Sequence, residues 1–113
     1  MTITKTEEFC DGDRYRYDSM LFKQGFATLD SASDAWYFGQ WACPFKRVLF
    51  SYVEGDCTTT ECETDAEFTA EVLKVADWHR KHDKFHGIDC GLGDGHKATE
   101  EAFRALGLGE LLH

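Results

Sequence analysis

The feature that most constrains the fold is a long amphipathic helix, which we predict over residues 64–82. Thr64 is a favourable N-cap residue, and Glu67 three positions later completes a capping box, in which each side chain bonds a backbone amide of the other residue. Acidic residues crowd the first turns and basic residues the last, which suits the helix dipole at both ends. When successive side chains are placed 100° apart around the helix axis, one side of the helix is mostly apolar and should face a core. Trp78 lies at the border of this apolar stripe. The stripe consists of Phe68, Val72, Val75, Ala76 and His79.

The half of the chain before this helix is predicted to consist of strands. Residues 1–9 are typical of a frayed end or an edge strand. We predict further strands over residues 14–17, 22–29, 35–41 and 47–53, from their alternation or their aromatic content. The first of these should turn Tyr15 and Tyr17 inward, and Gly25 would be a weak point or bulge in the second. Residues 55–63, rich in threonine and acid, are predicted to form a loop that leads to the helix.

A second helix is predicted over residues 97–106, ended by Gly107. Its inward residues should be Ala98, Ala102, Phe103 and Leu106, and the leucines at 108, 111 and 112 should fold back onto the core. Strands followed by helices indicate an α+β fold. We therefore predict an antiparallel sheet of three to five strands, with the helices about 64–82 and about 97–106 against one face. The length fits a single compact domain over residues 1–113.

Composition narrows the class of protein further. With 42% hydrophobic and 14% aromatic residues the chain can fill a core, so wholesale disorder is not expected. The first eight residues have neither the basic nor the apolar region of a signal peptide, and no apolar run is long enough to cross a membrane. We therefore expect a cytoplasmic protein. Its five cysteines should be reduced thiols, most of them small core residues.

The formal charge of −9 is concentrated in one stretch of the chain. Residues 1–53 and residues 74–113 each carry six basic and seven acidic residues, so each is near neutral. Residues 54–73 carry seven acidic residues and no basic one, and no cation lies between Arg47 and Lys74. A negative net charge of this size disfavours direct binding to nucleic acid or to an anionic membrane, because both are negatively charged themselves.

The acidic stretch predicts a surface that binds another protein. Glu67 and Glu71 are one helical turn apart, about 6 Å, and alternate residues of an extended segment stand about 6.6 Å apart. Successive phosphates of a nucleic-acid strand are similarly spaced, so such a surface can imitate them and occupy a basic cleft. A solvated face that only keeps the protein soluble is the alternative, although such a face usually mixes charges of both signs. The predicted partner-binding residues are Glu54, Asp56, Glu61, Glu63, Asp65, Glu67 and Glu71.

A second group of residues could bind a metal. His79 and His82 are three positions apart on the predicted helix, and His86 or Cys90 just beyond its end could complete a tetrahedral zinc site. The cysteines at 57 and 62 cannot join them as a zinc finger, because His79 lies fifteen residues beyond the helix start, about 22 Å away. The alternative is a core histidine at 79 and surface histidines at 82 and 86.

Function is predicted from these two groups. The favoured hypothesis is a non-enzymatic protein, such as the small acidic inhibitors carried by phages and plasmids, that presents its acidic face to a basic nucleic-acid-binding surface of a partner protein. The alternative is a small metal- or ligand-binding enzyme that uses His79, His82, His86 and Cys90. A third hypothesis is a homodimer formed through a sheet face, because the aromatic content exceeds what the core obviously needs. No catalytic residues and no cofactor other than zinc are predicted, since no nucleophile–base arrangement is present.

Overall fold

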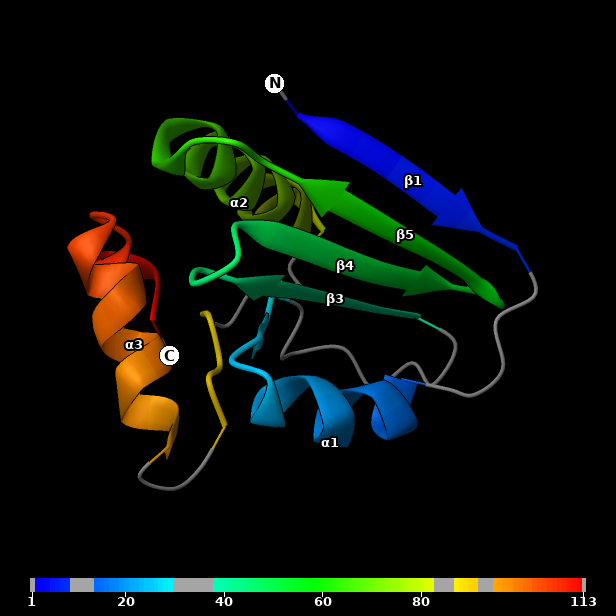
Figure 1. The fold of residues 1–113 in the computed structure, drawn as a ribbon, viewed down its shortest axis with the longest axis horizontal. Coiled ribbons are helices and arrows are strands. Elements are labelled where there is room, and N and C mark those ends of the chain that lie inside the picture. The colour runs from blue at the N-terminus through cyan, green and yellow to red at the C-terminus, as the bar shows by residue number, and fades with distance from the viewer. Residues whose placement is uncertain (1, 9–13, 30–37, 83–86, 92–94, 113) are drawn as a thin grey trace.

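The computed structural model describes residues 2–8, 14–29, 38–82, 87–91 and 95–112. In these residues one antiparallel sheet has the strand order β1-β5-β4-β3-β2 (Figure 1). The strands are β1 (Ile3–Glu7), β2 (Ala27–Thr28), β3 (Phe38–Cys43), β4 (Val48–Val53) and β5 (Asp56–Glu61). The helices are α1 (Arg14–Lys23), α2 (Asp65–Lys81) and α3 (Gly95–Ala105), followed by the short 3-10 helix η1 (Gly109–Leu111). The predicted α+β fold with an antiparallel sheet and two main helices is confirmed.

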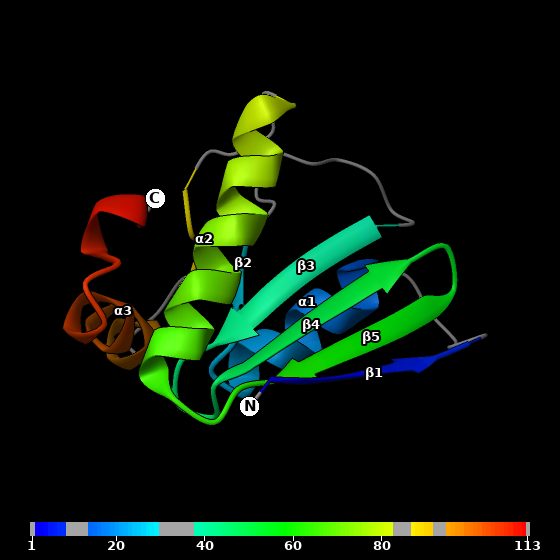
Figure 2. The ribbon, with the colours of Figure 1, turned by 90° about the horizontal axis from the view of Figure 1, so that it is seen from above.

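Helices cover both faces of the sheet: α2 and α3 share one face, as predicted, and α1, which was not predicted as a helix, covers the other (Figures 1 and 2). Because side chains alternate along a strand, each face has its own core. Beneath α2 and α3 lies a core that includes Ala42, Leu49, Phe68, Val72 and Phe103. Beneath α1 lies a second core that includes Leu21, Trp41, Cys43, Tyr52 and Cys57. The sheet is therefore the middle layer of three.

α1 replaces the strand predicted over residues 14–17, and that prediction is wrong. The ring of Tyr17 lies 5.2 Å from that of Tyr52 and 5.4 Å from that of Phe50, on the face of the sheet opposite α2. Leu21, one helical turn after Tyr17, is buried in the same core. A helix therefore turns Tyr17 and Leu21 towards the same core, and this packing overrides the local alternation of aromatic and charged residues.

The strand predicted over residues 22–29 is reduced to Ala27 and Thr28. The amides of Gly25 and Phe26 donate to the carbonyls of Phe22 and Leu21, and Gly25 has a φ of 89°. These paired bonds form a Schellman motif, which ends a helix. Gly25 is thus the residue that ends α1 and not a strand bulge.

β5 replaces the loop predicted over residues 55–63. Val53 and Asp56 pair across a two-residue turn in which Glu54 and Gly55 both have positive φ, 48° and 96°. Positive φ at both central positions matches the right-handed twist of the flanking strands and favours a hairpin. β5 then pairs with β4 on one side and with the edge strand β1 on the other.

The predictions for the two main helices are confirmed apart from one residue. Thr64 caps α2 with the predicted capping box, and its buried residues are Phe68, Val72, Ala76 and His79. In α3, Phe103 is buried as predicted, but Ala98 is exposed and Thr99 is buried in its place. α3 starts at Gly95, two residues before the predicted start. None of the described helices combines the length and the apolar character needed to cross a membrane.

Candidate binding surface

The seven acidic residues predicted to contact a partner fall into two groups in space. Glu54 and Asp56 lie at the turn between β4 and β5. The other five lie where β5 ends and α2 begins, and we call them the acidic end: Glu61, Glu63, Asp65, Glu67 and Glu71. The length of β5 separates the two groups, so that Asp56 lies about 17 Å from Glu61 at a rise of about 3.3 Å per residue.

Two cations pair with the acidic end. The Nε atom of Arg47, from the turn between β3 and β4, lies 2.8 Å from Oδ1 of Asp65, and Nη1 of Arg47 donates to the carbonyl oxygen of Glu63 over 3.2 Å. Lys74 Nζ lies 3.9 Å from Oε2 of Glu71, one turn earlier on α2. Counted over the described residues alone, these five carboxylates and two cations sum to a net charge of −3. The acidic end is therefore partly neutralised, but not cancelled, by its neighbours.

Glu67 also has a structural role. Its Oε2 accepts from the amide of Thr64 over 3.1 Å, and its own amide donates to Oγ1 of Thr64 over 3.1 Å. Its Oε1 accepts from Oγ1 of Thr2 over 3.0 Å, which links the start of α2 to the chain just before β1. A substitution of Glu67 would therefore disturb the helix start as well as the surface charge.

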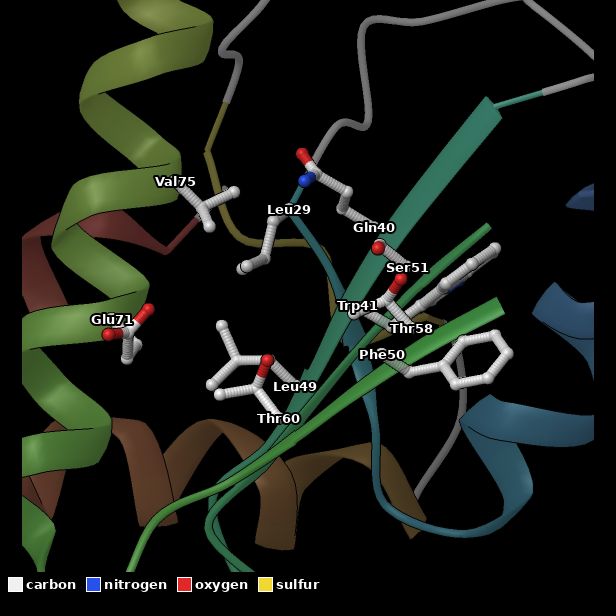
Figure 3. Close-up of a pocket in the computed structure, with 10 residues that line it drawn as sticks. All are labelled: Leu29, Gln40, Trp41, Leu49, Phe50, Ser51, Thr58, Thr60, Glu71 and Val75. Atoms are coloured by element: carbon white, nitrogen blue, oxygen red, sulfur yellow. The ribbon is translucent and has the colours of Figure 1, made fainter. Parts of the chain in front are cut away.

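A groove that the sequence did not predict runs between α2 and the sheet. It consists of two adjoining cavities of about 70 and about 290 Å³, which share Gln40, Glu71 and Val75. In the inner cavity Glu71 and Val75 lie on the α2 side and Leu49 and Thr60 on the sheet side (Figure 3). The outer cavity is lined in addition by Phe38, Lys74 and Trp78. The groove thus combines aromatic rings, one carboxylate and one ammonium group.

Hydroxyl groups extend the floor of the groove towards the edge of the sheet. Thr4 and Thr60 are hydrogen-bonded through their side chains at 3.3 Å, and Thr6 and Thr58 at 3.2 Å. Both pairs are directly opposite each other in the register of β1 and β5, on the face that bears α2. Threonine at the alternate positions 2, 4 and 6, together with the run of threonine at 58–60, is the sequence signal that could have revealed this polar face.

Each of the two described histidines of the predicted metal group has one ring nitrogen in a hydrogen bond within the protein. His79 is buried, and its Nε2 hydrogen-bonds to Oε1 of Gln40. His82 Nδ1 donates to the carbonyl oxygen of Trp78 over 2.8 Å, and the two rings are stacked with centroids 4.2 Å apart. His86 lies outside the described residues. Among those that the structure does describe, no three His, Cys, Asp or Glu side chains gather as metal ligands would.

Cys90, the fourth member of that group, is a buried thiol. Burial, with the nearby carboxylates of Glu100 and Asp89, raises its pKa from 9.0 to about 12. Only the thiolate binds zinc or acts as a nucleophile, so this environment disfavours both. Cys43, Cys57 and Cys62 are also buried, as predicted for most of the cysteines.

Comparison of the chain with protein-family models, with curated proteins and with solved structures finds no match. The candidate surface therefore rests on the geometry of the acidic end and of the groove beside it.

Proposed function

We propose that this chain is a non-enzymatic acidic interaction protein that docks its acidic end on a basic, nucleic-acid-binding surface of a partner protein. The observation that carries the proposal is the gathering of five carboxylates at the junction of β5 and α2, against two cations. Glu67 and Glu71 project from successive turns of α2 at about 6 Å. That separation is close to the one between successive phosphates of a nucleic-acid strand.

The charge of the whole molecule supports the same partner. A chain of net charge −9 is attracted over long range to a positive surface, and this attraction speeds the encounter of two proteins. Nucleic acids and anionic membranes carry the same sign as this chain and are disfavoured as direct partners. Binding in a cleft that normally holds nucleic acid would make the protein an inhibitor of the kind carried by phages and plasmids.

Charge reversal at two residues of the acidic end tests the proposal. We choose Glu61→Lys with Glu63→Lys, because both residues are exposed and neither belongs to the capping box. The matched control is Glu101→Lys with Glu110→Lys, which changes the net charge equally on α3 and η1. The immobilised wild-type protein should capture a basic protein from a cell lysate at low salt, and added DNA should release it by competing for the same cleft.

The two double variants should then differ. The variant at the acidic end should lose the captured protein at low salt, whereas the control should retain most of it, because only the former changes the contact surface. Equal capture by both variants at low and at high salt would refute the proposal. So would a captured protein that DNA does not displace.

A further inference from the structure

We propose that the outer part of the groove beside α2 receives an arginine side chain of the partner, held between Phe38, Trp78 and Glu71. The inference rests on the proposed function and adds the chemistry of the residue that would anchor the complex. The arginine would bind in the groove, whereas the acidic end steers the encounter of the two proteins. Glu71 belongs to both the groove and the acidic end.

The shape and lining of the cavity suit one long side chain. Its volume of about 290 Å³ lies at the lower end of the range for ligand sites, too small for a large cofactor. Most of its lining is apolar, from Phe38, Val75 and Trp78, which suits the methylene stem of an arginine. Its carboxylate is that of Glu71, so the polar end of the occupant should carry positive charge.

Aromatic rings and a carboxylate together select a guanidinium group. The face of an aromatic ring attracts cations, most strongly in tryptophan. Glu71 has a side chain only 29% exposed, and a partly shielded carboxylate pairs more strongly than one surrounded by water. A planar guanidinium can stack on a ring and bond a carboxylate with two parallel N–H groups, whereas a lysine ammonium is a strongly hydrated point charge.

The rings of the aromatic wall contact neighbouring rings of the protein itself. Trp78 is 51% exposed, yet its ring is stacked on His82 and meets the ring of His79 edge-on at 4.9 Å. Phe38 lies 6.4 Å from Trp78, with the two rings inclined by 30°. Because these neighbours fix the ring, binding a side chain against it costs little additional conformational entropy.

Lys74 is the one lining residue that opposes a cation. Its ammonium lies 3.9 Å from the Glu71 carboxylate, but its side chain is 77% exposed. An ion pair at the 3.9 Å limit whose lysine is mostly exposed is weak and can open without much loss. A guanidinium could therefore displace the lysine, and removal of Lys74 should favour binding.

The test is a nuclear magnetic resonance titration of the purified protein with N-acetylarginine amide. The control ligand is N-acetylcitrulline amide, which has nearly the same shape and no charge. We expect the arginine derivative, but not the citrulline derivative, to shift the indole N–H resonance of Trp78. Glu71→Gln should weaken binding about tenfold, and Lys74→Ala should strengthen it about twofold. Glu101→Gln, on the far helix α3, should leave it unchanged.

Equal shifts with both ligands, or no shift of the Trp78 resonance, would overturn the assignment. So would binding that Lys74→Ala weakens. The titration contains no partner protein, so it fails independently of the capture experiment. A partner captured through Glu61 and Glu63, without an arginine response at Trp78, would overturn the groove assignment alone. An arginine response without such a partner would overturn the proposed function alone.

Discussion

The indole Nε1 of Trp41 donates a hydrogen bond of 2.6 Å to Oδ1 of Asp18, which joins β3 to α1 across the second core of the molecule. Trp41 is fully buried, and its ring packs 6.3 Å from Tyr17 and 5.6 Å from Phe50. A buried indole N–H needs an acceptor, and Asp18 supplies it from a helix that the sequence did not predict. The bond thus fixes where α1 sits on the sheet.

Asp18→Ala should destabilise the protein by about 1–3 kcal/mol, because it leaves the buried indole N–H of Trp41 without this acceptor. Unfolding in urea, followed by the fluorescence of the tryptophans, would measure the loss. Asp77→Ala is the control, since Asp77 pairs with Arg80 on the exposed side of α2 and should cost less than about 0.5 kcal/mol. Equal losses in the two variants would contradict the structural role of Asp18.

Thr64→Ala should cost about 1 kcal/mol of stability, because it removes the N-cap hydroxyl that accepts from the amide of Glu67. Thr69→Ala, in the interior of the same helix, should be neutral or slightly stabilising, since alanine has the higher helix propensity. Thermal unfolding of both variants by circular dichroism would compare them. A loss at Thr69 as large as at Thr64 would indicate that the capping box contributes little.

Elements determined by local sequence could be predicted, and those determined by distant contacts could not. The capping box and the apolar stripe of α2 lie within one segment, so the prediction over residues 64–82 agrees closely with the structure. α1 was missed because its local pattern alternates like a strand, whereas Tyr17 and Leu21 gain their burial from β3, β4 and β5. Here tertiary packing overrides propensity.

In the candidate surface, too, only the features determined by local sequence could be predicted. The acidic residues 61–71 are neighbours in sequence, so their proximity could be predicted. The pairing of Asp65 with Arg47 could not, because it depends on where the turn between β3 and β4 places a residue 18 positions away. The groove depends on how α2 crosses the sheet, which brings Phe38 beside Trp78. Its local sign in the sequence was threonine at the alternate positions 2, 4 and 6 and in the run 58–60.

The ion pair of Arg47 with Asp65 should contribute less than about 1 kcal/mol, because its side chains are 42% and 63% exposed. A double-mutant cycle with Arg47→Gln and Asp65→Asn would measure the coupling free energy from urea unfolding. We expect a small favourable coupling at low salt that disappears at high salt, as screening requires. A coupling that is large and independent of salt would contradict this expectation.

Cys90 should resist alkylation in the folded protein. A pKa of about 12 leaves roughly one thiol in ten thousand ionised near pH 8, and burial also blocks the reagent. Iodoacetamide treatment with and without urea, followed by peptide mass spectrometry, would locate the modified cysteines. Cys90 should react only in urea, and the buried Cys43, Cys57 and Cys62 should behave likewise. Rapid labelling of Cys90 in the native protein would show that this thiol is accessible.

We expect the purified protein, without a histidine tag, to contain less than one zinc ion per chain. The Nε2 atom of His79 is bonded to Gln40, and among the residues that the structure describes no three His, Cys, Asp or Glu side chains gather as metal ligands would. Elemental analysis would measure the metal, and thermal unfolding with a chelator would test its contribution to stability. Chelation should leave the melting temperature unchanged, because a chelator destabilises a protein only when a bound metal contributes to the stability of its fold. A stoichiometric metal that disappears in His82→Ala, with a lower melting temperature after chelation, would instead favour the metal-dependent alternative.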